Sequence, residues 1–133
     1  MGTEILLLIF AMSIVGSTLG AFTGLVPGIH VNTLAAVMLA SYSSLFSAIS
    51  AFAEPEAVPV LVSSCILSAS VVHSFMDFIP SVFIGAPDAD EALTMLPGHR
   101  LLMEGRGMVA VRAAAAGSAV GALSAVALSI PVQ

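Results

Sequence analysis

The sequence has little that can face water. It contains three arginines and no lysine, and charged residues make up only 8% of the chain. Soluble domains carry roughly a quarter charged residues, so a water-exposed surface cannot be built from this composition. The shortage of basic residues also excludes nucleic-acid binding, which requires a positively charged patch. The solvent of this chain is therefore lipid.

Cysteine is almost absent as well. Cys65 is the single cysteine, which excludes a disulfide framework and a thiolate metal site. The three histidines, His30, His73 and His99, lack the spacing of a metal-ligand motif. No Ser-His-Asp arrangement is indicated by the sequence. We therefore expect no enzyme activity, no cofactor and no metal.

Apolar sequence is what the chain has in abundance, at 59% of its residues. Crossing a hydrocarbon core takes about 20 apolar residues, and four segments reach that length. We predict an all-α integral membrane protein of the plasma membrane, with residues 1–133 forming a single transmembrane domain. Glu4 stands where a secretory signal needs positive charge, so the first segment is predicted to be a retained helix. The four spans are expected at residues 5–26, 31–52, 58–79 and 108–130.

The few charges are unevenly distributed. Arg100, Arg106 and Arg112 all flank the start of the last span, whereas the connection between the second and third spans carries Glu54 and Glu56. The positive-inside rule places the arginine-bearing connection in the cytoplasm. With four crossings, both termini would then lie outside.

The stretch "GLVPGIHVNTLAA", residues 24–36, interrupts the apolar pattern. Pro27 and Gly28 should end the first span, and Asn32 or Thr33 can cap the next helix. Exposed backbone at membrane depth is tolerated only inside protein or beside water. A helix N-terminus in such a place suits a carboxylate. Two interpretations remain open, a tight turn at the membrane surface and one half of an anion site.

A second interruption follows the third span, in "IPSVFIGAPDADEALTMLPGHRLLMEGRG", residues 79–107. Asp88 precedes Glu91 by three residues, a capping-box pattern that predicts a short amphipathic helix over residues 88–97. The preceding "SVFIGAP" is expected to form either a re-entrant dip or a surface loop. The expected fold thus has broken or re-entrant segments near residues 26–32 and 79–88.

The third span carries ionisable residues near its end. His73 and Asp77 are four residues apart and would share one helix face. Ionisable groups in a membrane segment are functional candidates by default, for proton coupling, a cation site or substrate binding. The alternative is a solvated helix end. Hydroxyl groups in the same span fit a polar lining or ordinary interhelical hydrogen bonds: Ser63, Ser64, Ser68, Ser70 and Ser74.

Glycines recur at four-residue spacing in two spans. They are Gly16, Gly20 and Gly24 in the first span, and Gly117 and Gly121 in the last. Small residues at this spacing let helix backbones approach closely in lipid. We expect these faces to pack within the bundle or between chains.

The two interrupted segments resemble a known family. "GAFTGLVPGIHVNTLAA" is similar to the glycine- and proline-rich signature near the start of the large membrane subunit of tripartite tricarboxylate transporters, the TctA-type superfamily. "FIPSVFIGAPDADEALTMLPGHRLLMEGRG" resembles that family's second conserved region, with its Pro-Ser, Gly-x-Pro, acidic residue and short helix. Order and spacing agree over residues 16–107. The segments "HVN" and "LPGHRLL" are most similar to the archaeal branch of the superfamily.

The resemblance implies a secondary transporter for small organic carboxylates, di- or tricarboxylate-like anions, driven by an ion gradient. His73 and Asp77 would then be the candidates for ion or proton coupling. "GIHVNT" stands where bacterial members usually have another glycine, which is a departure from a tricarboxylate-specific pattern. The substrate-side residues that the resemblance implies are Pro27, Gly28, His30, Asn32 and Thr33 in the first motif, and Ser81, Gly85, Pro87 and Asp88 in the second.

Members of this family are several times longer than 133 residues. The chain could be a truncated piece, one subunit of a split transporter that needs a complementary membrane subunit, or a half-unit that forms a homodimer. Transporters often build their site from two inverted repeats, so antiparallel pairing of two copies is one hypothesis. The alternative function is a small membrane scaffold or assembly subunit that does not transport. The depth of the two breaks in the membrane would discriminate between these functions.

Overall fold

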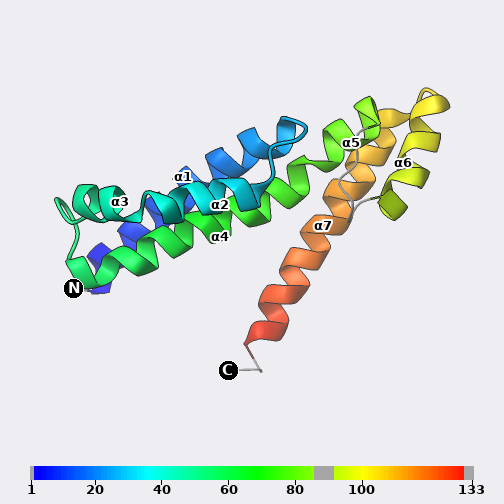
Figure 1. Ribbon diagram of the computed structural model, residues 1–133. Helices are drawn as coiled ribbons and strands as arrows, with labels where there is room; N and C mark the ends of the chain where they lie inside the picture. Colours follow the sequence, from blue (N-terminus) through cyan, green and yellow to red (C-terminus); the bar gives the residue numbers. More distant parts are fainter. Residues whose placement is uncertain (1, 86–91, 131–133) are drawn as a thin grey trace. The chain divides into compact units, whose positions relative to one another are not determined.

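The computed structural model of the protein describes residues 2–85 and 92–130, and in these ranges all regular structure is helical (Figure 1). The chain divides into two compact units, Met1–Met76 and Asp77–Gln133. Each unit is described in turn. The first contains α1 (Gly2–Leu25), α2 (Val31–Ala40), α3 (Tyr42–Ile49), the short 3-10 helix η1 (Pro55–Ala57) and α4 (Val58–Met76).

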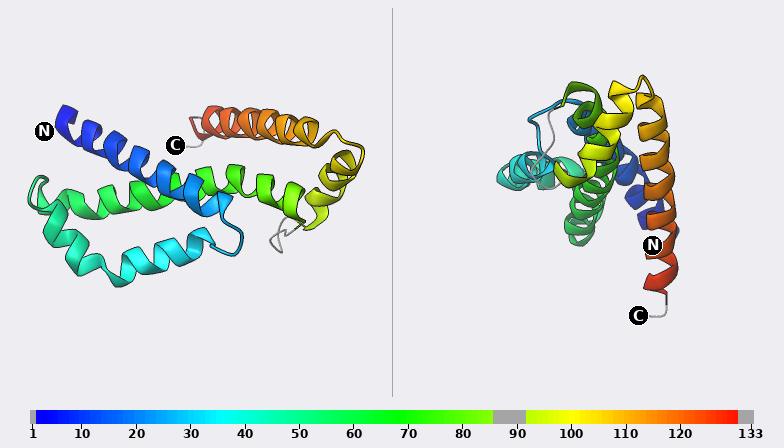
Figure 2. Two further views of the ribbon diagram at one scale, coloured as in Figure 1. Left: turned by 90° about the horizontal axis from the view of Figure 1, so that it is seen from above. Right: turned by 90° about the vertical axis from the view of Figure 1, so that its right-hand side faces the viewer.

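The first unit is built on the pairing of α1 with α4, which lie side by side along their lengths (Figures 1 and 2). Their register is constant, because each contact pairs residues 49 or 50 positions apart (65 − 16, 69 − 20, 73 − 23). Residue numbers increase in the same direction along both helices, so α1 and α4 run parallel. The contacts that define the register are Gly16 with Cys65, Gly20 with Ala69, and Thr23 with His73.

The glycine face of α1 makes this close pairing possible. A Cβ at Gly16 would stand 2.8 Å from the carbonyl carbon of Cys65, so no larger residue fits against the α4 main chain there. Gly24 is buried on the same face. Small residues in lipid act in this way because association depends on van der Waals contact between backbones. The packing face expected from the first glycine series is confirmed, and it lies within the bundle.

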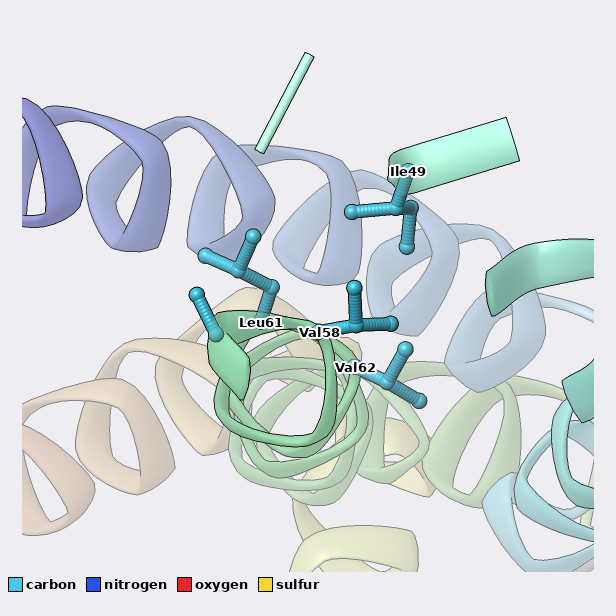
Figure 3. Packing of buried hydrophobic residues seen from close by; sticks show 5 residues of the cluster. Ile49, Val58, Leu61 and Val62 are labelled. Carbon is cyan, nitrogen blue, oxygen red and sulfur yellow. The ribbon is translucent and has the colours of Figure 1, made fainter. Parts of the chain in front are cut away.

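Parallel α1 and α4 require the chain to return between them. The return is made by α2 and α3, which are bent by 72° relative to each other. Ile49, the last residue of α3, packs with Val58 and Leu61 of α4, and Leu8 of α1 packs against the same cluster (Figure 3). The chain leaves α1 at the C-terminal end of that helix, and by the end of α3 it lies beside the N-terminal half of α1 again. The bent pair is therefore a broken span that crosses the layer, not a loop that dips and withdraws.

The break in this span lies at Ser41, inside a segment that the sequence predicts as one helix over residues 31–52. Ser41 has φ −93° and ψ 11°, outside the helical range, although its amide still donates to the carbonyl oxygen of Val37 at 2.9 Å. Serine competes for backbone hydrogen bonds and is a poor helix former. Three serines within four residues, Ser41, Ser43 and Ser44, weaken the helix at the bend.

The second unit contains α5 (Phe78–Ile84), α6 (Ala92–Met103) and α7 (Gly107–Ser129). Residues 88–91 of the helix expected over 88–97 lie outside the described residues. At its C-terminal end the helix differs from the expectation, because α6 continues through Pro97 to Met103. The packing of Gly98 accounts for this continuation, since a Cβ at position 98 would meet Val82 and Phe78 of α5 at 2.9 and 3.3 Å. This close packing on α5 offsets the hydrogen bond that a proline removes from a helix.

The last helix, α7, contacts its unit only near its start. Gly107 and Ala110 are buried, whereas every residue from 121 to 130 is exposed. Added Cβ atoms at Gly117 and Gly121 would meet nothing within 4 Å among the described residues. The second glycine series therefore has no packing partner in the described part of the chain.

The expected fold class is confirmed. Three helical segments are long and apolar enough to cross a membrane, Gly2–Leu25, Pro55–Ile84 and Gly107–Ser129, and there are four if the bent pair counts as one span. The third of the predicted spans, residues 58–79, corresponds to α4 and the start of α5. Asp77 stands between these two helices, and its φ of −66° and ψ of −22° are helical. Whether residues 1–133 form a single domain stays a prediction.

Candidate substrate and coupling sites

The first interruption is a β-turn that joins α1 to α2. The amide of Ile29 donates to the carbonyl oxygen of Val26 at 3.2 Å, with Pro27 and Gly28 at the two central positions. Gly28 has φ +87°. Proline at the second position and a positive φ at the third are typical of a type II turn, where glycine is favoured. The backbone of this turn therefore favours glycine at position 28 and suits proline at position 27.

The helix that follows the turn begins two residues earlier than a cap at Asn32 would allow, and three earlier than a cap at Thr33 (32 − 30, 33 − 30). His30 is the N-cap, in extended conformation with φ −78° and ψ 147°, and its carbonyl oxygen accepts from the amide of Thr33 at 3.0 Å. The expected capping role is therefore wrong, because the β-turn ends at Ile29 and leaves only His30 before α2. Asn32 and Thr33 lie in the first helical turn, and within the described part of the chain the N-cap position makes no side-chain capping hydrogen bond.

The residues of the first motif lie on the surface of the first unit. Pro27, Gly28, His30, Asn32 and Thr33 are all exposed. An amide side chain and a hydroxyl group thus lie beside a helix N-terminus, whose first amides carry partial positive charge. This arrangement supplies hydrogen-bond donors suited to an anion.

The second motif is described only in part. Ser81 is buried in α5, and its hydroxyl donates to the carbonyl oxygen of Asp77 at 2.8 Å. Gly85 ends α5 in the left-handed conformation with φ +72°, and its amide donates to the carbonyl oxygen of Ser81. Residues 81–84 are thus helical, and whether this segment is a re-entrant dip or a surface loop stays a prediction. Pro87 and Asp88 lie outside the described residues.

His73 is buried near the end of α4, with only 5% of its surface exposed. Its Nδ1 lies 3.0 Å from Oγ1 of Thr23, a residue of α1 that is itself 6% exposed. Sequence reasoning missed Thr23. A signal was present, because Thr23 lies between Gly20 and Gly24 on the glycine face that contacts α4.

Asp77 was expected to share a helix face with His73. In the structure α4 ends at Met76, and Asp77 is the N-cap of α5 in the second unit. Both His73 and Asp77 have polar interactions. Their joint role in ion coupling stays a prediction.

Serines of α4 donate hydrogen bonds to carbonyl oxygens of their own helix. Ser64 donates to the carbonyl oxygen of Val60 at 2.8 Å, Ser68 donates to that of Ser64, and Ser74 donates to that of Ser70 at 3.1 Å. Such bonds four residues back are common for serine inside helices. They satisfy three of the five hydroxyl groups without a polar channel or a neighbouring helix.

Charged groups gather at the turn between α6 and α7. Glu104 lies 3.4 Å from Nε of Arg100 and 3.7 Å from a terminal nitrogen of Arg106. All three side chains are exposed, so these ion pairs contribute little to stability. In the described residues, no three His, Cys, Asp or Glu side chains lie together so as to hold a metal ion.

Long apolar helices, a broken span and glycine-mediated backbone packing define a multi-pass integral membrane protein. The chain belongs to the tripartite tricarboxylate transporter TctA family, which it matches over residues 10–133. This is a family of transporters and not of enzymes, and the chain is a transporter component of the plasma membrane. The expected family membership is thereby confirmed.

One curated relative is an uncharacterized protein, MJ1079, from Methanocaldococcus jannaschii. It is 34% identical to this chain over 117 residues, which cover 88% of this chain and 26% of the relative. The chain thus spans about a quarter of the length of the relative that it matches. No solved structure matches the chain.

Proposed function

We propose that the protein moves small organic carboxylates, di- or tricarboxylate-like anions, across the plasma membrane with an ion gradient as the driving force. In this proposal the first motif supplies part of the anion site. The second motif, with Ser81, Gly85, Pro87 and Asp88, supplies another part. His73 and Asp77 serve ion or proton coupling.

The observation that carries this proposal is the polar first turn of α2. Asn32 and Thr33 are exposed there, beside a helix N-terminus that has no side-chain capping hydrogen bond among residues 2–85 and 92–130. Unpaired polar groups that face hydrocarbon cost several kcal/mol, roughly 2–7 kcal/mol for an amide or hydroxyl group. Such a turn in a membrane segment is stable when it faces a polar cavity. A bound carboxylate would accept hydrogen bonds from these groups.

The position of the turn along the bundle supports a link to His73. In the register of α1 and α4, Thr23 is level with His73, and α1 ends two residues later at Leu25. The turn therefore lies about 3–6 Å further along the axis than His73, at about 1.5 Å per helical residue. A site at the start of α2 and a coupling group at His73 would be close enough for mutual influence.

We further propose that other membrane helices complete the transporter, from a second copy of this chain or from a complementary membrane subunit. One finding supports this: α7 exposes Gly117 and Gly121, and a Cβ added at either glycine would meet nothing within 4 Å among the described residues. Cross-linking of the purified protein in bilayers tests the homodimer, and its antiparallel form requires both orientations of the chain in one membrane.

Uptake and binding in proteoliposomes test the proposed function. Wild-type protein is assayed with a panel of di- and tricarboxylates, in comparison with Asn32→Ala and Asp77→Asn. The matched control is Ser43→Ala, which removes an exposed polar group of α3 outside the motif. We expect Asn32→Ala to weaken substrate binding and Asp77→Asn to reduce the ion dependence of uptake, with the control unchanged. A substrate that both variants bind and move like wild type would remove the site assignment.

The alternative function is a membrane scaffold or assembly subunit. It is favoured by the finding that the Pro-Gly pair forms an ordinary type II turn, which needs no ligand to explain it. Failure of the wild-type chain to bind any carboxylate of the panel would favour the scaffold.

A further inference from the structure

We propose that Arg112 binds the phosphate group of an anionic phospholipid in the cytoplasmic leaflet, on the side of α7 that faces lipid. The binding of lipid by this side chain does not depend on the carboxylate transport proposed above. Three features of the second unit lead to it, which are the two sides of α7, the unpaired charge of Arg112 and the depth of this residue in the membrane.

Small residues gather on one side of α7. Gly107 and Ala110 are buried against the rest of the second unit, where a Cβ on Gly98 would stand 3.7 Å from that of Ala110. Gly117 and Gly121 continue the same side of the helix. At about 100° per residue, Arg112 lies roughly 140–180° around the helix from all four residues of α7. Arg112 therefore points away from the side of α7 that packs on protein.

The side of α7 that carries Arg112 is apolar and exposed. Met108, Leu123 and Val126 lie within about 40° of Arg112 around the helix axis, and all three are exposed. In membrane proteins small residues are found where helices pack on one another. The large aliphatic side chains beside Arg112 thus indicate the side of α7 that faces lipid.

The positive charge of Arg112 is not balanced by the described part of the chain. Glu104, in the turn before α7, lies 3.4 Å from Nε of Arg100 and 3.7 Å from a terminal nitrogen of Arg106. Arg112 is exposed and belongs to none of the ion pairs among residues 2–85 and 92–130. An arginine inside a membrane segment is costly unless its charge finds a partner or reaches the surface. The anion that pairs with Arg112 must come from outside these residues.

Arg112 lies within reach of the lipid headgroups. It stands five residues after Gly107, the first residue of α7 (112 − 107), which is about 7.5 Å along the helix axis. Side chains of a helix lean toward its N-terminus, and a long arginine side chain can extend its charged end to the membrane surface. The positive-inside rule makes this the cytoplasmic surface.

A phospholipid phosphate group has the chemistry that this position requires. The guanidinium group presents parallel N–H donors that match two oxygens of a phosphate group. Phosphate groups form the layer that the side chain of Arg112 reaches from α7. An anionic headgroup is preferred over phosphatidylcholine, because it brings no quaternary ammonium group to compete for the phosphate, and its net charge attracts arginine.

Native mass spectrometry of the full chain in a non-ionic detergent measures the binding of single phospholipid molecules. The probe is phosphatidylglycerol, with phosphatidylcholine as the zwitterionic comparison. We expect the wild type to bind phosphatidylglycerol more tightly, and Arg112→Gln to raise the dissociation constant for this lipid about fivefold. Arg112→Lys keeps the charge but loses the fork of N–H donors. Its dissociation constant should lie between those of the wild type and Arg112→Gln.

The matched control is Arg100→Gln. This variant also removes one exposed arginine, but the guanidinium group of Arg100 already pairs with Glu104. We expect its dissociation constant for phosphatidylglycerol to change by less than about twofold. Equal losses in Arg100→Gln and Arg112→Gln would indicate a diffuse attraction to the charged surface and overturn the assignment to Arg112. Equal binding of the two lipids by the wild type would overturn it as well.

Solid-state nuclear magnetic resonance tests the contact in a bilayer. The full chain, with carbon-13 in its arginine side chains, is reconstituted in vesicles that contain phosphatidylglycerol, in a buffer free of phosphate. We expect lipid phosphorus to dephase the Cζ signal that is lost in Arg112→Gln. Absence of this dephasing overturns the proposal, as when a carboxylate of another membrane helix pairs with Arg112. A failure of the chain to bind carboxylates leaves this result unchanged.

Discussion

Gly20 of α1 lies directly on the main chain of Ala69 in α4, so that a Cβ at position 20 would stand 2.8 Å from the Cα of Ala69. The neighbouring atoms are backbone atoms, which cannot move aside as the tip of a flexible side chain can. The same relation holds one turn earlier, between Gly16 and Cys65. The parallel pairing of α1 with α4, and with it the crossing made by α2 and α3, depends on these two contacts.

Gly20→Ala should therefore destabilise the first unit. Overpacking of a close contact costs about 1–3 kcal/mol, and here it exceeds the gain of about 0.5–1 kcal/mol that alanine normally brings to a helix interior. The free energy of unfolding in mixed micelles measures the effect. Gly121→Ala is the matched control, because its Cβ would meet no described atom within 4 Å. Equal stability of the two variants would mean that α1 and α4 do not touch through this face.

The turn between α1 and α2 places a different demand on glycine. Gly28 has φ +87° and open space around its Cα, so a side chain there meets backbone strain and no steric contact. We expect Gly28→Ala to cost about 1–2 kcal/mol of unfolding free energy. Gly28→Asn should cost less, since asparagine tolerates the left-handed region better than alanine. If alanine and asparagine cost nothing, this residue does not adopt the conformation of a type II turn.

Much of this fold could be predicted from the sequence, because lipid solvent makes segment length informative. The first span, predicted at residues 5–26, is α1 at Gly2–Leu25, and the last, predicted at 108–130, is α7 at Gly107–Ser129. The Pro27-Gly28 interruption was also predictable, since proline and glycine restrict the backbone locally. The glycine face of α1 could be identified from its four-residue spacing alone.

Features that depend on tertiary contacts could not be predicted in the same way. The serines around Ser41 weaken the helix locally, but only the return of the chain beside α1 indicates that the bent segment is a broken crossing. The bond between Thr23 and His73 joins residues 50 positions apart (73 − 23). It requires the register of two helices, which spacing within either helix does not contain. Pro97 led to a predicted helix end at residue 97. In the structure the tertiary packing of Gly98 overrides this local helix breaker, and α6 continues.

Gly98 in α6 gives a test of packing in the second unit. A Cβ at this position would stand 2.9 Å from Cγ2 of Val82, the tip of a fully buried side chain. Gly98→Ala should cost about 1 kcal/mol or more by overpacking, and Val82→Ala should cost stability through the cavity that it leaves. Combined, the two changes relieve each other, and the double-mutant cycle should give a coupling of about 0.5–3 kcal/mol. Strict additivity in the measured unfolding free energies would show that α6 does not pack on α5 through Gly98.

Labelling with a membrane-impermeant maleimide tests the broken span, in a Cys65→Ala background that removes the single native thiol. The cysteine variants are Ile29→Cys before α2, Glu54→Cys after α3, and Met103→Cys at the end of α6. Because α2 and α3 cross the layer, positions 29 and 54 should be labelled from opposite sides. The arginines near position 103 place that side in the cytoplasm, so Ile29→Cys and Met103→Cys should react in inside-out vesicles and Glu54→Cys in right-side-out vesicles. Labelling of positions 29 and 54 from the same side would make the bent pair a re-entrant loop and would contradict the parallel register of α1 and α4.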